Sequence, residues 1–412
     1  MNHALSLTSR AEQQLPAFVR QRMDEHYVER IGKLLGGEHL HQWQPVPANA
    51  VMLAGNDYLQ IAAEPGLLAA QARVLQAGGA ALMSSVFLQE GSRQHRLEHR
   101  LAGFLGSEAC VLAQSGWAAN VGLLQSLAGP GVPVYLDMQA HASLWEGVQS
   151  AQAVPVPFLH NDTGHLQRQL GKHGPGMIVV DALYSTNGSV APLAAMADIA
   201  ERSASMLIVD ESHSLGTHGP QGAGLVAALG LASRVHFRTA SLAKAFGGRA
   251  GLVTCSEHFK GYFLSASRPA IFSSCLLEHE LAWFDAALDF IASAQADIRR
   301  AALHRNSAML RAGLAGLGYN TSEGSEQIIA LEAGSEPDTL KLRKALERHG
   351  IYGAVFCAPA TPKNRSLVRL TINAALREDD IARVLAACAA IRDEVGMARW
   401  PSTRRLRKLA LV

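Results

Sequence analysis

Short apolar runs recur along the chain, and each ends in a polar tip followed by a segment with helical spacing. The pattern starts at VMLAGNDYL (51–59), and its six clearest runs are ACVLAQSG (109–116), PVYLDMQAH (133–141), GMIVVDALYS (176–185), SMLIVDESHS (205–214), VHFRTASLAK (235–244) and AGLVTCS (250–256). Runs that are apolar on both faces are typical of strands in a covered parallel sheet. Segments such as AANVGLLQSLAG (118–129) fit the crossover helices. The alternation predicts an open α/β sheet with helices on both faces.

The same pattern predicts three regions. Residues 1–55 are mixed and polar, with a helical stretch over 15–35, and residues 56–300 carry the predicted sheet. A long helical segment (276–318) leads into residues 301–412. The sequence predicts that this last region is a smaller α+β domain. Its expected elements are two strands (326–333 and 366–373), two helices (339–350 and 378–395) and a basic tail (399–412).

Composition gives no reason to expect a nucleic acid or a membrane as a partner. The 412 residues are 48% hydrophobic and 17% charged, and the formal net charge is only +2. The longest charge-free run (109–136) contains too many polar residues, prolines and glycines for a lipid-facing helix. Five scattered cysteines without a CxxC pair, and no apolar leader, predict a reducing, cytoplasmic location.

The polar tips of the predicted strands should meet, because ligands of open α/β sheets bind beyond the carboxyl ends of the strands. These tips are Ser115-Gly116-Trp117, Asp137 to His141, Asp181 to Ser185, Asp210 to His213 and Ser241 to Lys244. Together they offer a carboxylate, two imidazoles, hydroxyls, a glycine turn and an amine. This set suits pyridoxal phosphate (PLP). A metal site is not expected, because Asp210 and His213 lack further ligands at metal spacing.

Each member of this set has a role toward PLP and a plainer alternative. Asp210 can pair with the pyridine nitrogen, or simply cap a helix. His213 can hydrogen-bond the phenolic oxygen, or be a satisfied turn histidine. The QSGWAAN turn (114–120) and Ser241 can bind the phosphate, or only cap helices. His141 can stack on the ring, or be a core histidine.

Lys244 lies in TASLAKAFGG (239–248), among small and apolar residues and shortly before two glycines. A free lysine has a pKa of about 10.4. Burial in such surroundings would lower the pKa of Lys244, and a neutral amine can form a Schiff base with an aldehyde. Gly247 and Gly248 would let the backbone pass close to a cofactor. The alternative is a surface lysine at a helix start.

Taken together, these motifs resemble the α-oxoamine synthase family of fold-type-I PLP enzymes. The resemblance spans roughly Met52 to Val384 and rests on NDYL (56–59), SGWAAN (115–120), DMQAHAS (137–143), DALYSTNG (181–188), VDESHSLG (209–216), TASLAKAFGG (239–248), RPAIFSS (268–274) and VRLTINAA (368–375). It implies a PLP-binding domain with a mostly parallel, seven-stranded-type sheet. It also implies a homodimer whose active sites lie at the interface.

The resemblance further implies a role for each site residue. Lys244 would hold the cofactor as a Schiff base and then act as the general base, and Asp210 would pair with the pyridinium. The other cofactor contacts would be His213 and Ser185 at the phenolic oxygen, His141 on the ring face, Ser115, Gly116, Trp117 and Ser241 at the phosphate, and Ser273 reaching that phosphate from a neighbouring subunit. Arg369 would bind the amino-acid carboxylate, and Asn56 would border the substrate pocket.

Several stretches, including LAQSGWAAN, HASLWEGV and VDESHSLGTHGP, are similar to the family members that make α-hydroxyketone quorum-sensing autoinducers. This similarity implies S-adenosylmethionine or 2-aminobutyrate as amino donor and a medium-chain acyl-coenzyme A as acyl donor. Three alternatives stay open. They are another α-oxoamine synthase using glycine, alanine or serine, an aminotransferase, and a non-catalytic partner subunit.

One segment departs from the family pattern. In QEGSRQHRLEHRL (89–101), the pair Gly91-Ser92 lies two positions closer to Leu97-Glu98 than in relatives, and Gln94 stands where they usually carry a histidine. The sequence therefore predicts an altered loop beside the acyl entrance.

Overall fold

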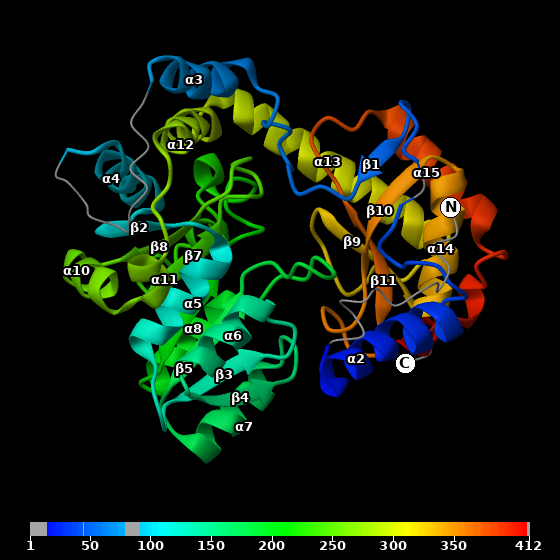
Figure 1. Cartoon of the computed structure of the whole chain (residues 1–412), viewed down its shortest axis with the longest axis horizontal. Helices are drawn as coiled ribbons and strands as arrows, with labels where there is room; N and C mark the ends of the chain where they lie inside the picture. The colour runs from blue at the N-terminus through cyan, green and yellow to red at the C-terminus, as the bar shows by residue number, and fades with distance from the viewer. Residues whose placement is uncertain (1–14, 44, 79–90, 410–412) are drawn as a thin grey trace.

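The computed structural model describes residues 15–43, 45–78 and 91–409. It has two α/β parts, which we call the large part and the small part (Figure 1). The large part is built on a sheet with the strand order β2-β8-β7-β6-β5-β3-β4, and the small part on a sheet with the order β1-β10-β11-β9. Helix α13 (Ala294–Gly316) leads from the large part into the small part.

The seven-stranded sheet of the large part confirms the predicted fold class. Its strands are β2 (Ala109–Ala113), β3 (Pro133–Asp137), β4 (Val154–Phe158), β5 (Met177–Asp181), β6 (Met206–Asp210), β7 (Phe237–Ser241) and β8 (Gly251–Cys255). All run parallel to one another except β8, which is antiparallel to both of its neighbours. The sequence pattern does not predict β4, because Pro155 and Pro157 interrupt it. Prolines lack the N–H that a central strand needs, and β4 lies at an edge, where this is tolerated.

Helices cover both faces of this sheet, as the doubly apolar runs predict. Val179 of β5 packs into a core with α5 (Gly116–Leu127), α6 (Ala142–Ser150) and α10 (Glu257–Ala266). Its neighbours Ile178 and Val180 point the other way and pack with α7 (Thr163–His173) and α8 (Leu193–Arg202). The remaining helices of this part are α3 (Pro65–Gln76), α4 (Arg93–Leu105), η2 (Pro220–Gly222), α9 (Leu225–Ala228), α11 (Arg268–Phe272) and α12 (Glu278–Ile291).

The small sheet takes one strand from the N-terminal segment. Strand β1 (Val51–Leu53) pairs in parallel with β10 (Ile351–Phe356), and β11 (Ser366–Thr371) runs antiparallel between β10 and β9 (Ile328–Gly334). The helices around this sheet are α2 (Ala17–Asp24), the π-helix η1 (Glu25–Leu34), α14 (Glu336–Arg348), α15 (Glu378–Ile391), η3 (Met397–Arg399) and α16 (Pro401–Leu409). The sequence pattern does not predict β10, a short run interrupted by Gly353.

The predicted helix over 276–318 is divided in two. Between α12 and α13, the Ser293 hydroxyl accepts a hydrogen bond from the Ala296 N–H at 3.3 Å and caps α13. Residue 300, the expected domain boundary, therefore lies inside α13.

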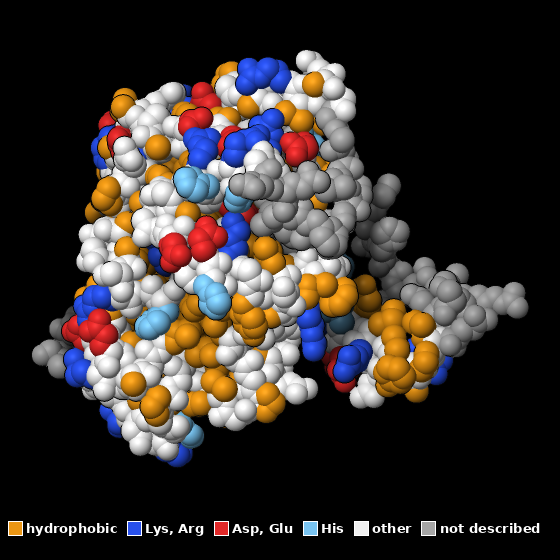
Figure 2. Space-filling view, turned by 90° about the vertical axis from the view of Figure 1, so that its left-hand side faces the viewer, with side chains coloured by type: hydrophobic (Ala, Val, Ile, Leu, Met, Phe, Trp, Pro, Cys, Tyr) orange, Lys and Arg blue, Asp and Glu red, His pale blue; other side chains and the backbone are white. Residues whose placement is uncertain are grey.

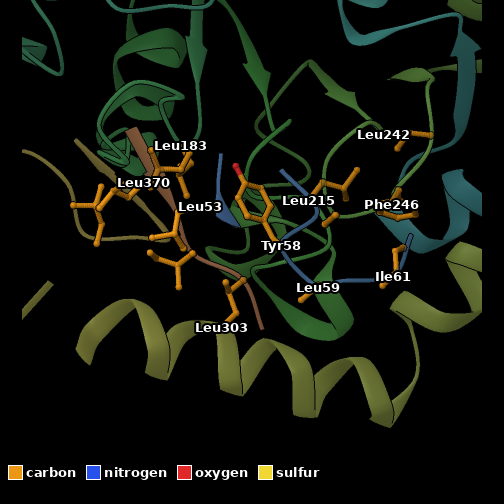
Figure 3. Packing of buried hydrophobic residues seen from close by; sticks show 14 of the residues in the cluster. Leu53, Tyr58, Leu59, Ile61, Leu183, Leu215, Leu242, Phe246, Leu303 and Leu370 are labelled. Atoms are coloured by element: carbon orange, nitrogen blue, oxygen red, sulfur yellow. The ribbon is translucent and has the colours of Figure 1, made fainter. Parts of the chain in front are cut away.

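The segment between β1 and α3 joins the two parts through one hydrophobic core. Its residues Leu53, Tyr58, Leu59 and Ile61 are fully buried. Figure 3 shows them beside Leu183, Leu215, Leu242 and Phe246 of the large part and beside Leu303 and Leu370 of the small part. Burial of this much apolar surface holds the two sheets at one relative position.

Within the described residues, no helix is both long and apolar enough to cross a bilayer. The described residues include all five cysteines and contain no disulfide, and Cys275 is partly exposed while the other four are buried.

A buried ion pair joins β7 to the residue that follows β6 in the large sheet. Arg238 on β7 donates from Nε to Glu211 Oε2 at 2.6 Å, and both side chains are almost completely buried. Glu211 also accepts from the Val226 N–H and the Ser214 hydroxyl, each at 3.0 Å. Removal of one partner would leave the other charge buried without compensation.

We expect Arg238→Met to lower the free energy of unfolding by about 3–5 kcal/mol, because Glu211 would lose its buried counter-ion. Urea unfolding followed by circular dichroism measures this change. The control is Arg234→Met, because Arg234 makes its ion pairs with Asp198 and Glu201 at the surface and should leave stability nearly unchanged. Equal effects of the two substitutions would contradict the prediction.

Candidate active site

A cleft of about 730 Å³ lies between the large and small parts. Residues predicted from the sequence line it from both sides: Trp117, His141, Ser185, His213 and Lys244 from the large part, Asn56 from the joining segment, and Arg369 from β11. Asp210 and Ser241 are the last residues of β6 and β7, at the same edge of the sheet. The structure thus brings together residues that are up to 313 positions apart in the chain.

Fixed hydrogen-bond donors hold the buried carboxylate of Asp210. Asn120 on α5 donates from Nδ2 to Asp210 Oδ2 at 2.6 Å, and the Ser212 N–H donates to Oδ1 at 2.8 Å. The Asn120 Oδ1 accepts from the Thr239 hydroxyl at 2.6 Å, which orients the amide. The Asp210 carboxylate is therefore held both by the turn that follows β6 and by a side chain of α5.

The same amide connects Asp210 to His141. Asn120 Nδ2 lies 2.8 Å from Ser143 Oγ, which in turn lies 2.8 Å from His141 Nδ1. The backbone N–H of His141 donates to Asp181 Oδ2 at 2.9 Å. Burial lowers the pKa of His141, although the charge of Asp210 opposes this shift. The neutral form of the His141 ring is therefore favoured near pH 7.

His213 is buried and hydrogen-bonded to Tyr58, whose hydroxyl lies 2.6 Å from His213 Nδ1. Burial raises the pKa of Tyr58, so the phenol keeps its proton. Burial also lowers the pKa of His213 well below its ordinary value, and the charges of Lys244 and Arg369 lower it further. A protonated phenol beside a neutral imidazole can donate to Nδ1, and the ring hydrogen then lies on Nε2.

The start of α5 forms a site that suits an anion. Ser115 Oγ accepts from the Ala118 N–H at 3.1 Å, so the N–H groups of Gly116 and Trp117 lie in the first turn without an intrahelical acceptor. A Cβ on Gly116 would lie only 2.6 Å from the Cβ of Ser241. The lack of a side chain on Gly116 therefore lets the helix start approach β7. This approach brings together four of the five residues predicted to bind phosphate, which are Ser115, Gly116, Trp117 and Ser241.

Lys244 lies in a bend after β7, and not at the helix start that the alternative reading required. Burial lowers the pKa of its amine, and the charge of Arg369 lowers it further against the opposing effect of Asp210. The direction of this shift is the one predicted from the sequence. The neutral amine is consequently more populated near neutral pH than that of a free lysine.

Arg369 is buried on the opposite wall of the cleft. Its Nη1 donates to the Ser185 carbonyl at 2.9 Å, its Nη2 donates to Asn56 Oδ1 at 3.0 Å, and the guanidinium lies over the Phe356 ring at 4.4 Å. Among the described residues, its Nε is buried without a hydrogen-bond partner. A held cation with a spare donor suits a carboxylate ligand.

The structure does not bring Ser273 to this cleft. Its hydroxyl donates to the Pro269 carbonyl at 2.5 Å at the end of α11, and Ser273 is not among the residues that line the cleft of its own chain. Contact with the phosphate would have to come from a second chain, as the family resemblance implies.

The segment that departs from the family pattern (89–101) contains the start of α4. Gln94 is buried and donates from Nε2 to Glu98 Oε1 at 3.0 Å, and Glu98 pairs with Lys260 at 2.8 Å. Gln94 therefore anchors the helix and does not face the cleft. Residues 79–90, which include Gln89 and Glu90 of this segment, lie outside the described residues.

Sequence reasoning did not assign roles to Tyr58, Asn120 or Asp181. The first two lie within NDYL and SGWAAN, so the motifs marked the right positions. However, their partners are 155 and 90 residues away in the chain, and only the folded structure reveals these contacts.

Comparison with known proteins agrees with this geometry. A family model described as aminotransferase class I and II matches residues 48–388. The chain belongs to this family. It is 42% identical over 375 residues to a CAI-1 autoinducer synthase of Vibrio campbellii, covering 91% of this chain and 95% of the relative. It is 32% identical over 352 residues to an 8-amino-7-oxononanoate synthase of Trichlorobacter lovleyi, covering 84% and 90%.

Among solved structures, a serine palmitoyltransferase from S. paucimobilis with a bound PLP–myriocin aldimine matches with a TM-score of 0.84. The identity is 28%, and the match covers 91% of this chain and 98% of the other. These relatives confirm the predicted membership among the α-oxoamine synthases, the PLP cofactor and the acyltransferase class of the enzyme. The residues present fit PLP, because the cleft combines the approach of Gly116 to Ser241 with a buried carboxylate and a buried amine.

We expect Arg369→Gln to raise the pKa of Lys244, because loss of a nearby cation favours the charged amine. The reactive neutral amine would then be populated only at higher pH. The pH midpoint for Schiff-base formation between the apo-protein and PLP, followed by absorbance, should therefore move upward.

Arg365→Gln is the matched control, because this second arginine of the cleft is paired with Glu323 and Glu332. Its midpoint should match that of the unaltered protein. An unchanged or lower midpoint in Arg369→Gln would contradict the assigned coupling.

Proposed function

We propose that this enzyme joins S-adenosylmethionine or 2-aminobutyrate to a medium-chain acyl-coenzyme A by decarboxylating condensation. The product is an α-aminoketone-type precursor of an α-hydroxyketone quorum-sensing autoinducer. The observation that carries the proposal is a single cleft holding a buried amine, Lys244, and a buried cation with a spare donor, Arg369. The identity of 42% to a CAI-1 autoinducer synthase supports the choice of substrates.

In this proposal, the residues around Asp210 hold the cofactor. Asp210 would keep a proton on the ring nitrogen, and His213, whose Nδ1 is occupied by Tyr58, would donate from Nε2 to the phenolic oxygen. Ser185 would also bind that oxygen, and His141 would stack on the ring. Bound PLP supplies an electron-accepting ring that stabilises the electron pair left at the substrate Cα.

The phosphate of the cofactor is assigned to the start of α5. The N–H groups of Gly116 and Trp117 would donate to it, together with the hydroxyls of Ser115 and Ser241. The approach of Gly116 to Ser241 supports this assignment, because it places donors from α5 and β7 side by side.

The remaining residues act on the substrates. Arg369 and Asn56 bind the donor carboxylate, and the neutral Lys244 Nζ takes the Cα proton. A bond then forms between Cα and the thioester carbonyl carbon while the C–S bond breaks, which releases coenzyme A as a thiolate that takes a proton from solvent. The carboxylate leaves as carbon dioxide, and Lys244 returns its proton to Cα. With S-adenosylmethionine, loss of a Cβ proton to solvent and breakage of the Cγ–S bond also release methylthioadenosine and leave a carbon–carbon double bond in the product.

A second candidate is an α-oxoamine synthase that uses glycine, alanine or serine. The identity of 32% to an 8-amino-7-oxononanoate synthase favours it over more distant reactions. A non-catalytic partner subunit is disfavoured, because such a subunit would not need Lys244 or the contacts around Asp210. Aminotransfer alone would leave the acyl donor unused.

We further propose a cytoplasmic homodimer in which Ser273 completes the phosphate site of its partner. Phe272, next to Ser273, has 81% of its surface exposed, and Tyr262 on α10 is also exposed. Helices α10 and α11 lie on the left-hand side of Figure 1, and hydrophobic side chains gather on this side of the molecule in Figure 2. Exposed apolar groups of this kind favour association.

A matrix of amino donors against acyl-coenzyme A chain lengths tests the reaction. We expect thiol and carbon dioxide release, and a condensed product by mass spectrometry, with S-adenosylmethionine or 2-aminobutyrate and medium-chain acyl donors. Glycine, alanine and serine should be at least about tenfold slower. Faster turnover with these three would favour the second candidate. A transaminated keto acid without thiol or carbon dioxide would reject both.

Mixing two inactive variants tests the dimer. In a mixture of Lys244→Ala and Ser273→Ala chains, each heterodimer would contain one site with both native residues. We expect activity to rise toward about a quarter of the native value if chains exchange at random. The control is Lys244→Ala mixed with a Lys244→Ala, Ser273→Ala double variant, which should stay inactive. No recovery in exchanged heterodimers would contradict the shared site.

A further inference from the structure

Three side chains outside the cleft converge from separate segments. His218 lies in the turn that follows His213, His304 lies on α13, and Glu326 precedes β9. One donor atom from each lies within 4.8 Å of the other two. His218 Nε2 is 2.9 Å from Glu326 Oε2, and His304 Nδ1 is 3.9 Å from the same oxygen.

In each histidine, the ring nitrogen that is not paired with Glu326 contacts Thr217. His304 Nε2 is 2.9 Å from the Thr217 carbonyl, which can only accept, so Nε2 carries the hydrogen and Nδ1 presents a lone pair. The Thr217 hydroxyl lies 3.1 and 3.0 Å from the carbonyls of His213 and Ser214, either of which can accept its single proton. With the proton placed there, the hydroxyl oxygen accepts from His218 Nδ1 at 2.8 Å, and His218 Nε2 presents a lone pair toward Glu326.

Two imidazole lone pairs and a carboxylate therefore face one point. Such an arrangement is repulsive unless a cation occupies that point, one histidine takes up an extra proton, or His218 carries its hydrogen on Nε2 and donates to Glu326. Metal-bound histidines characteristically donate their other ring N–H to a carbonyl or another oxygen, as both histidines do here.

We propose that His218, His304 and Glu326 form a binding site for a divalent transition-metal ion of the zinc type. Two imidazoles and one carboxylate are a ligand set that Zn²⁺ accepts, with water in the remaining position. The site is accessible, because the side chains of Glu326 and His304 are 23% and 41% exposed. Sequence reasoning missed it, because the ligands come from three distant segments.

The position of this site gives the ion a structural role. It would tie the His213–His218 turn to α13 and to the start of β9. Gln327, next to Glu326, donates to the His213 carbonyl at 2.8 Å. The ion would therefore secure the turn that carries His213 without touching the cleft.

Metal uptake by the PLP-loaded enzyme tests the proposal. The chelator-treated enzyme is dialysed against Zn²⁺ or Co²⁺, and bound metal is counted by elemental analysis, with Co²⁺ absorption reporting nitrogen and oxygen ligation. We expect one equivalent per native chain and loss of that equivalent in His304→Ala and in the size-conserving Glu326→Gln. Thr217→Val should weaken binding by about 10–100-fold, because it removes the acceptor for His218 Nδ1.

His173→Ala, which removes an exposed histidine of α7, is the matched control and should bind metal as the native chain does. Unchanged circular dichroism and PLP absorbance identify the variants that remain folded. Equal metal uptake by the native chain and folded Glu326→Gln would overturn the proposal, as would no uptake by the native chain. In either case the cluster would be a metal-free hydrogen-bonded group in which a histidine donates to Glu326.

Discussion

Asp210 ends β6 at a position almost closed to solvent, so the protein itself must supply the hydrogen bonds of its carboxylate. Asn120 supplies one of them and, through Ser143, is also connected to His141, which lines the cleft. A single amide on α5 thus orients two side chains of the site. Helix α5 can hold that amide in place because Gly116 allows its first turn to approach β7.

The second requirement is the fixed position of the small part. Arg369 comes from β11 and reaches across to Ser185 of the large part and Asn56 of the joining segment. These hydrogen bonds can form only if the two sheets stay at a fixed distance from each other. The buried segment from Leu53 to Ile61 provides this, since it packs against both sheets at once. Tyr58, in the same segment, also reaches His213, so packing and chemistry share one short stretch of chain.

Much of the fold and the site could be predicted, because the deciding signals are local. Apolar runs ending in polar tips identified six of the seven large-sheet strands, and parallel pairing then placed Asp210, Ser241 and Lys244 at one edge. Strand β4 was not predicted, because a strand with two prolines is acceptable only at the edge of a sheet. The sequence does not indicate which strand lies at the edge. The contact of Asn120 with Asp210 could not be predicted, because it joins segments that are distant in the chain. The same holds for the contact of His218 with Glu326. No local pattern of apolar and polar residues indicates either contact.

The two prolines of β4 have a consequence for the behaviour of the protein in a crowded solution. An outermost strand with a full row of N–H groups can pair with a strand of another molecule and so start aggregation. In β4, Pro155 and Pro157 each lack this group, while the strand still pairs with β3 on its inner side. The outer border of the sheet at β4 therefore lacks two of the N–H donors that intermolecular strand addition would use.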